Sequence, residues 1–263
     1  ALQWATNWRE SHIWIVAFLP LAGLVSGLIY HYFGQSVEAG NNLLLEEIHN
    51  PQQVIPLRMA ILILMGTVVT HLFGGSAGRE GTALQMGTAL SDRLTGLWRL
   101  KKEDRRILLM CGISGGVASV FGTPLAGTLF GLEVLAIGRI RYDGLFPCLI
   151  AAIVGDYTTS FIISKWGGHR TEYDLVGGFA TNLQDLTGNV VNLISAVIAG
   201  IIFGLTALLF TKVTHRIKEF FKSKIPYPPL RPMFGGIIIA IAVLMIGTTK
   251  YIGLGIPTII SAF

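Results

Sequence analysis

The chain has 263 residues, of which 52% are hydrophobic and only 13% are charged, and its mean hydropathy is +0.61. Soluble domains carry about 25% charged residues, so this composition excludes a soluble protein and predicts a polytopic membrane protein. The net charge of +5 is small and clustered, which indicates membrane topology and argues against nucleic-acid binding. The two cysteines, Cys111 and Cys148, lie in apolar runs and indicate neither a disulfide framework nor a metal site.

Two long apolar runs with a short one between them lead to a glycine-rich stretch. Residues 12–33 are long enough to cross a bilayer, although Pro20 and Gly23 interrupt the run. Residues 43–48 are too short to cross and are predicted to be re-entrant or interfacial. Residues 57–73 then deliver the chain to the glycine-rich stretch.

Two half-length helices are predicted next. Residues 82–90 are too short to span and are followed by the polar residues 91–93. A glycine-rich run at 107–120 is broken at 121–124 and continues as a second half-length helix at 125–137. Small residues with the four-residue spacing that permits close helix crossing are Gly112 with Gly116 and Gly127 with Gly131.

The remainder of the chain contains further apolar runs separated by polar connections. Spans are predicted at 145–164 and 190–210, and another apolar run lies at 233–246. Basic loops at 99–106 and 212–231 are predicted to be cytoplasmic by the positive-inside rule. Both ends of the sequence look cut, so we expect a truncated chain.

Three turns interrupt these apolar runs: residues 40–42, 78–81 and 121–124. Broken helices at membrane depth are tolerated where they are buried in protein or line a cavity. Their N-termini carry unpaired N–H groups and the positive end of the helix dipole, so they can form an anion site without a formal charge. One such break alone is more often an ordinary kink, but three breaks, one of them containing Arg79 and Glu80, favour an anion site.

Three interpretations of Glu80 are open. It could be an interfacial carboxylate, one half of a structural pair with Arg79, or a tethered surrogate anion that binds and releases a proton as anions come and go. Because adjacent residues on a helix project in different directions, a direct bond between Arg79 and Glu80 is not expected. His71, which precedes the glycine-rich stretch, is more often a packed or pore-lining histidine than a proton relay.

Two segments together resemble a known family. Gly78-Arg79-Glu80-Gly81-Thr82, followed by residues 121–127 and 129–133, is similar to the CLC family of chloride channels and anion/proton antiporters, and most similar to its bacterial fluoride/proton antiporter branch. The resemblance implies an all-α fold of two inverted-topology halves with broken and half-length helices, here incomplete. It also implies homodimers with an independent pore in each subunit.

The resemblance also implies site residues. Glu80 matches the gating glutamate, which blocks the anion path when ionised and swings away when protonated. Gly78, Arg79, Gly81 and Thr82 match the turn whose N–H groups line the anion site.

At the first half-helix, Asn41 or Asn42 occupies the place of an anion-coordinating Ser in chloride members. Thr82 in place of Pro, Val134 in place of an internal proton glutamate, and the missing Ser all resemble the fluoride branch. The family's second-half motif and central-gate tyrosine have no counterpart before Phe263, so the chain is not expected to transport alone.

The sequence therefore predicts one partial CLC-type transmembrane domain over residues 1–263, in a bacterial inner membrane. Its expected function is fluoride export in exchange for protons, with Glu80 as gate and proton carrier, the lipid bilayer as its environment and no cofactor or metal. Three alternatives remain open: a chloride channel or chloride/proton exchanger, an integral-membrane enzyme using Glu80 as general acid/base with only His71 offered as a second group, and a non-transporting membrane scaffold.

Overall fold

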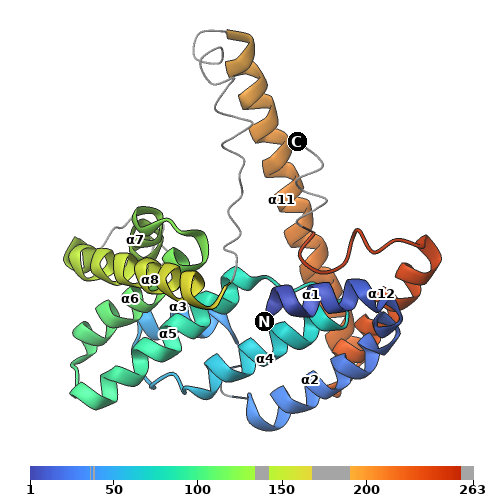
Figure 1. Cartoon of the computed structure of the whole chain (residues 1–263), viewed down its shortest axis with the longest axis horizontal. Helices are drawn as coiled ribbons and strands as arrows, with labels where there is room; N and C mark the ends of the chain where they lie inside the picture. Colours follow the sequence, from blue (N-terminus) through green and yellow to red (C-terminus); the bar gives the residue numbers. More distant parts are fainter. Residues whose placement is uncertain (36, 38, 134–141, 168–189, 256–263) are drawn as a thin grey trace. The chain divides into compact units, whose positions relative to one another are not determined.

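The computed structural model describes residues 1–35, 37, 39–133, 142–167 and 190–255, and every regular element in these ranges is a helix (Figure 1). The chain divides into two compact units, one made of Ala1–Arg170 with Pro229–Phe263 and the other of Thr171–Pro228. In the first unit the α-helices are α1 (Leu2–Ser11), α2 (Leu19–Phe33), α3 (Asn41–His49), α4 (Arg58–Leu72), α5 (Arg79–Trp98), α6 (Lys102–Phe121), α7 (Pro124–Glu133), α8 (Leu145–Trp166) and α12 (Leu230–Ile246). The second unit contains α11 (Val190–Lys224). The predicted all-α fold is confirmed.

Three helical stretches in the described ranges are long and apolar enough to cross a membrane. They are Ile13–Phe33, Tyr142–Trp166 and Ile194–Lys224, which confirms the spans predicted near 12–33, 145–164 and 190–210. The helices α4 and α12 are apolar but shorter.

Glycines allow α5, α6 and α7 to pack backbone against backbone. A Cβ atom on Gly112 of α6 would lie 2.7 Å from the carbonyl oxygen of Gly87 in α5, and one on Gly116 would lie 2.7 Å from that of Ala83. On the other side of α6, a Cβ on Gly127 of α7 would lie 2.8 Å from the carbonyl oxygen of Ser114. The close crossing predicted from the glycine spacing is therefore confirmed.

Helix α2 packs against α12, from the far end of the sequence. A Cβ on Gly23 would lie 2.6 Å from the carbonyl oxygen of Pro232, so Gly23 serves close approach between the helices. The predicted interruption at Gly23 is wrong, because α2 continues through it to Phe33. Pro20 lies in the first turn of α2, where its missing N–H costs nothing, and a 3-10 helix, η1 (Ile13–Phe18), precedes it.

The predicted half-length helix at 82–90 is also wrong. Helix α5 has 20 residues and continues through Ser91, Asp92 and Arg93 to Trp98. Asp92 does not end the helix because its carboxylate is fully buried and paired with Arg105 of α6. The polar residues 91–93 therefore lie inside the helix, and Asp92 is there because it contacts Arg105 of α6 and not because the helix ends.

Both predicted basic loops are largely helical. Lys102 begins α6, and Arg105 lies inside its first turn with a buried side chain. Helix α11 continues to Lys224, since Lys and Arg are good helix formers whose charges reach water from an exposed helical surface.

Two short helices begin at glycine turns, as predicted. Helix α3 has 9 residues and follows Gly40, whose φ is +58°. Helix α7 begins at Pro124, two residues after Gly122, which caps the C-terminus of α6 with a φ of +69°. These positive φ values favour glycine. The predicted end of the second half-length helix, after Glu133, lies outside the described residues.

Candidate functional site

The N-terminus of α5 presents an open first turn. Gly78 is its N-cap, with an extended backbone (φ −70°, ψ 130°) and no capping side chain. The first N–H groups of a helix have no partner within it, so those of α5 are available to a negative charge. Glu80 lies in this turn, where the helix dipole favours a carboxylate.

The Glu80 carboxylate is loosely held. Its side chain is 41% exposed, and Oε2 lies 3.4 Å from the position that a Cβ on Gly78 would occupy. A Cβ at Gly78 would therefore be in ordinary van der Waals contact with the carboxylate. Glu80 is close to the start of its own helix and is free to turn toward solvent.

Arg79 and Glu80 do contact each other, contrary to expectation. Arg79 Nε lies 3.4 Å from Glu80 Oε1, at the long end of hydrogen-bond distances. In a first helical turn both side chains are long enough to bend toward the N-terminus, so adjacent residues can meet there. The side chains of Arg79 and Glu80 are 16% and 41% exposed. An ion pair that water reaches contributes about 0–1 kcal/mol, so this long contact holds Glu80 only weakly.

Thr82 joins the first turn of α5 to α4. Its side chain is buried, and its Oγ1 lies 2.8 Å from Thr67 Oγ1 and 3.1 Å from the carbonyl oxygen of Gly78. Thr67 Oγ1 in turn lies 2.7 Å from the carbonyl oxygen of Ile63. Two hydroxyl protons serve these three contacts, so both protons are used within the protein. Thr82 is the fourth residue of α5, where the backbone N–H closes the first turn onto Gly78, so the open N–H groups belong to the residues before it.

The N-terminus of α3 meets the same turn. Asn41 and Asn42 are the first residues of α3, both are exposed, and no side chain caps the helix. Asn41 Nδ2 lies 3.5 Å from the Cβ position of Gly81 in α5. The structure thus brings Asn41 to the turn that contains Glu80. The N–H of Asn42 donates to the carbonyl oxygen of Ala39 at 3.2 Å, within its own turn.

Gln85 also takes part in this arrangement, although the sequence reasoning missed it. Its Nε2 donates to Asn41 Oδ1 at 2.9 Å. Gln85 lies four residues after Gly81, which places both on one face of α5. That spacing is the signal that could have identified it.

His71 is a packed histidine, which is one of the two roles that we considered more common than a proton relay. Its side chain is fully buried, its Nδ1 lies 2.8 Å from the carbonyl oxygen of Thr67, and its own carbonyl oxygen accepts a hydrogen bond from Arg9 Nη1 at 3.1 Å. Since Nδ1 must donate to a carbonyl, the neutral ring carries its proton on that nitrogen.

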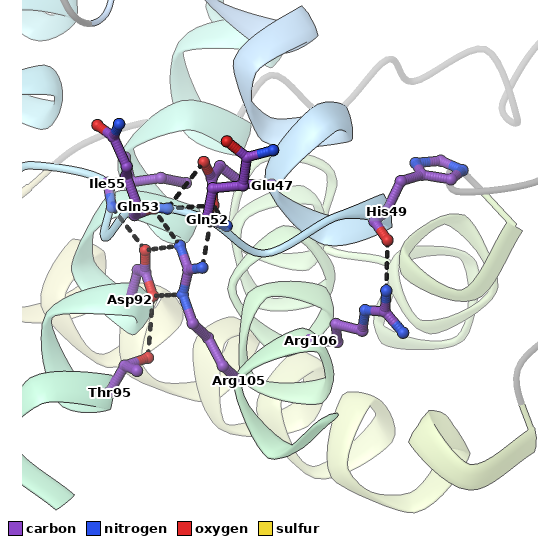
Figure 2. Close-up of polar contacts among 9 residues, drawn as sticks. All are labelled: Glu47, His49, Gln52, Gln53, Ile55, Asp92, Thr95, Arg105 and Arg106. Carbon is purple, nitrogen blue, oxygen red and sulfur yellow. Dashed lines mark hydrogen bonds and ion pairs between the residues drawn. The ribbon is translucent and has the colours of Figure 1, made fainter. Parts of the chain in front are cut away.

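A second charged cluster joins α3, α5 and α6, and it was not predicted (Figure 2). Arg105 Nη1 lies 2.9 Å from Glu47 Oε2, while Arg105 Nε and Nη2 each lie 2.7 Å from an oxygen of Asp92. Arg105 Nη2 also donates to the carbonyl oxygen of Gln53 at 2.6 Å. All three charged side chains are at most 7% exposed. We call Glu47, Asp92 and Arg105 the charge cluster.

The two carboxylates of the charge cluster are also satisfied by neutral donors. These donors, at 2.6–3.1 Å, are the N–H groups of Gln52, Gln53 and Ile55 and the hydroxyl of Thr95. Burial by itself would lower the pKa of Arg105, but its hydrogen bonds and charge interactions with Asp92 and Glu47 outweigh burial and raise that pKa. Arg105 therefore keeps its charge, and the charge cluster fixes the link between α3 and α4 to α5 and α6.

A nearby contact extends this junction. Arg106 donates to the carbonyl oxygen of His49, the last residue of α3 (Figure 2). Arg106 also pairs with Glu103 on the surface of α6 at 3.2 Å. The C-terminus of α3 is thus attached to α6, while its N-terminus reaches the first turn of α5.

The other predicted site positions lie elsewhere or outside the described residues. Glu133 ends α7 and is exposed. Val134 lies outside the described residues.

Comparison with known proteins gives consistent results. A family model described as "Voltage gated chloride channel" matches residues 22–263. A "Chloride/fluoride channel protein" of Pseudomonas syringae pv. tomato is 54% identical over the whole of this chain. The chain covers 57% of that relative's length.

Two solved structures are also similar. The crystal structure of a CLC-type fluoride/proton antiporter aligns with 99% of this chain at a TM-score of 0.85 and 30% identity, and the alignment covers 63% of that protein. The structure of a slow cyanobacterial chloride/proton antiporter aligns with 92% of this chain at a TM-score of 0.71 and 20% identity, covering 57% of that protein. At that identity the second match supports the fold alone.

Proposed function

This chain belongs to the voltage-gated chloride channel family, the CLC family, and on that basis we propose that its protein exports fluoride in exchange for protons. The observation that carries the proposal is the loosely held carboxylate of Glu80 in the open first turn of α5. Family membership makes transport, and not enzymatic catalysis, the proposed activity. The membrane proposed for it is a bacterial inner membrane, where it would act as a homodimer.

Glu80 serves in this proposal as both gate and proton carrier. When ionised, its carboxylate competes with an anion for the first-turn N–H groups of α5. Protonation removes the charge that holds the carboxylate there, so the side chain leaves and an anion can enter. Because Glu80 has one long contact with Arg79 and is partly exposed, moving it breaks little structure.

The remaining site residues supply donors. The backbone of Gly78, Arg79, Gly81 and Thr82 lines one side of the proposed anion position, and the start of α3, with Asn41 and Asn42, lines the other. Preorganised N–H groups stabilise negative charge without moving during transport.

Fluoride is favoured over chloride by three sequence features and by similarity. Thr82, Val134 and the absence of Ser at the start of α3 resemble the fluoride branch, and one relative is named for chloride and fluoride while one structural neighbour is a fluoride/proton antiporter. A chloride channel or chloride/proton exchanger remains the alternative. We also propose that residues 1–263 form one partial CLC-type transmembrane domain.

The test is a flux assay on the protein carrying this sequence in liposomes. Fluoride-selective and chloride-selective electrodes follow anion efflux while a pH electrode follows proton entry. We expect fluoride to leave much faster than chloride and protons to enter with it, and Glu219→Gln on exposed α11 to behave like the unmodified protein. Equal fluoride and chloride rates would contradict the fluoride assignment, and fluoride movement without protons would contradict antiport.

A further inference from the structure

We propose that Gln85 is a positioning residue that fixes the side-chain amide of Asn41, so that its N–H donors and not its oxygen face the turn of Glu80. This inference rests on the proposed function, since it concerns how that site selects an anion. It assigns a role to a residue of α5 that lies outside the Gly78–Thr82 turn.

The contact between the two amides is direct. Gln85 Nε2 donates to Asn41 Oδ1 at 2.9 Å. A primary amide has one acceptor end and one donor end, so engaging the oxygen decides which way the Asn41 amide points. The donor end of Asn41 is then left for the other side.

That other side is the gating turn. Asn41 Nδ2 lies 3.5 Å from the Cβ position of Gly81, the residue after Glu80. With Oδ1 bound by Gln85, Asn41 presents N–H groups to this turn. Turned over, the same amide would present its partly negative oxygen to an incoming anion, which repels it.

Gln85 also lies against the backbone at the start of α3. A Cβ on Gly40 would lie 3.4 Å from Gln85 Nε2 and 3.9–4.0 Å from the other amide atoms. The amide of Gln85 therefore lies along Gly40, whose φ of +58° already favours glycine. One side chain thus contacts both the turn that begins α3 and the first side chain of that helix.

The position of Gln85 on α5 makes this arrangement rigid. Gln85 and Gly81 are one helical turn apart on the same face, so the donor that orients Asn41 and the turn that Asn41 faces belong to one helix. Both move together when α5 moves, and the orientation of Asn41 relative to Glu80 is preserved.

Two substitutions separate orientation from packing. Gln85→Met keeps the length of the side chain but removes the hydrogen bond, so the Asn41 amide can turn over. Gln85→Glu supplies only acceptors when ionised, so it attracts the N–H groups of Asn41 and turns the oxygen toward the gate. We expect the KM for fluoride to rise about tenfold in Gln85→Met, and more in Gln85→Glu, with a smaller change in kcat. The matched controls, Gln3→Met and Gln3→Glu at an exposed position of α1, should change neither constant.

A double-mutant cycle with Asn41→Ala distinguishes positioning from general structural damage. If Gln85 acts through Asn41, adding Gln85→Met to Asn41→Ala leaves the KM for fluoride unchanged. A further tenfold rise in that background, or wild-type KM values in both Gln85 variants, would overturn the inference.

Calorimetric titration of the purified proteins with fluoride and with chloride keeps this result separate from the proposed function. If the unmodified protein moves chloride but not fluoride, the fluoride assignment fails. The effect of the Gln85 substitutions is then measured as a change in the dissociation constant for chloride. If it moves fluoride and the Gln85 variants bind fluoride like the unmodified protein, the inference alone fails.

Discussion

The charge cluster and the first turn of α5, two regions of the first unit in which arginine meets carboxylate, differ in how tightly the carboxylate is held. In the charge cluster, Arg105 makes contacts of 2.6–2.9 Å, and the side chain of Asp92 is fully buried. At the turn, Arg79 and Glu80 share one contact of 3.4 Å, and the side chain of Glu80 is 41% exposed.

The two carboxylates differ in the interactions that each would lose if its side chain moved out of its present position. Asp92 would abandon a bidentate arginine and two neutral donors inside the protein, a loss of several kcal/mol. Glu80 would abandon one weak contact and gain water. Both carboxylates belong to α5, so a fixed charge anchors the helix that carries a movable one.

The largest effect is expected from Arg105→Met. It leaves Glu47 and Asp92 buried without their cation, which costs about 3–5 kcal/mol of stability. Thermal unfolding in detergent should show a large fall in Tm. The matched substitution Arg79→Met should cost no more than about 1 kcal/mol. Similar losses in both variants would remove the distinction between the two regions.

The second-largest effect is expected where the backbones of α5 and α6 cross closely. A Cβ added at Gly112 would lie 2.7 Å from the carbonyl oxygen of Gly87, so Gly112→Ala should cost about 1–3 kcal/mol. Gly96, also in α5, has open space around it, and Gly96→Ala should stabilise the helix by about 0.5–1 kcal/mol. Opposite shifts in Tm are predicted, and equal shifts would contradict the close crossing.

A smaller effect is expected from the hydroxyl pair that joins the turn to α4. Thr82→Val should cost about 1 kcal/mol, because it leaves Thr67 without its hydroxyl partner. Thr67→Val/Thr82→Val together should cost less than the sum of the single changes, since both partners are then apolar. Thr70→Val, whose hydroxyl bonds only within α4, is the control. Additive losses would show that the two hydroxyls do not interact.

Local sequence features predicted the elements that local chemistry determines. Gly40 and Gly122 marked the starts of α3 and α7 because their backbone conformations favour glycine, and Gly112 marked a close crossing because only hydrogen fits there. The expected anion site likewise followed from the motif around Glu80.

Other features depended on partners far away in the sequence. Asp92 seemed to end a helix because Arg105, 13 residues later, and the N–H of Ile55, 37 residues earlier, were not visible as partners. Gln85 and Asn41 are 44 residues apart. No local pattern encodes such contacts, since the packing of α3 against α5 creates them.

The most direct test compares Glu80→Gln with Glu47→Gln in the liposome assay, together with Tm in detergent. We expect Glu80→Gln to keep the Tm of the unmodified protein but no longer to move protons with fluoride. Glu47→Gln should lower the Tm while the protein that remains folded keeps its proton-to-fluoride ratio. Proton-coupled fluoride movement that persists in Glu80→Gln, or a lost ratio in Glu47→Gln, would contradict the assignment of the movable charge to Glu80.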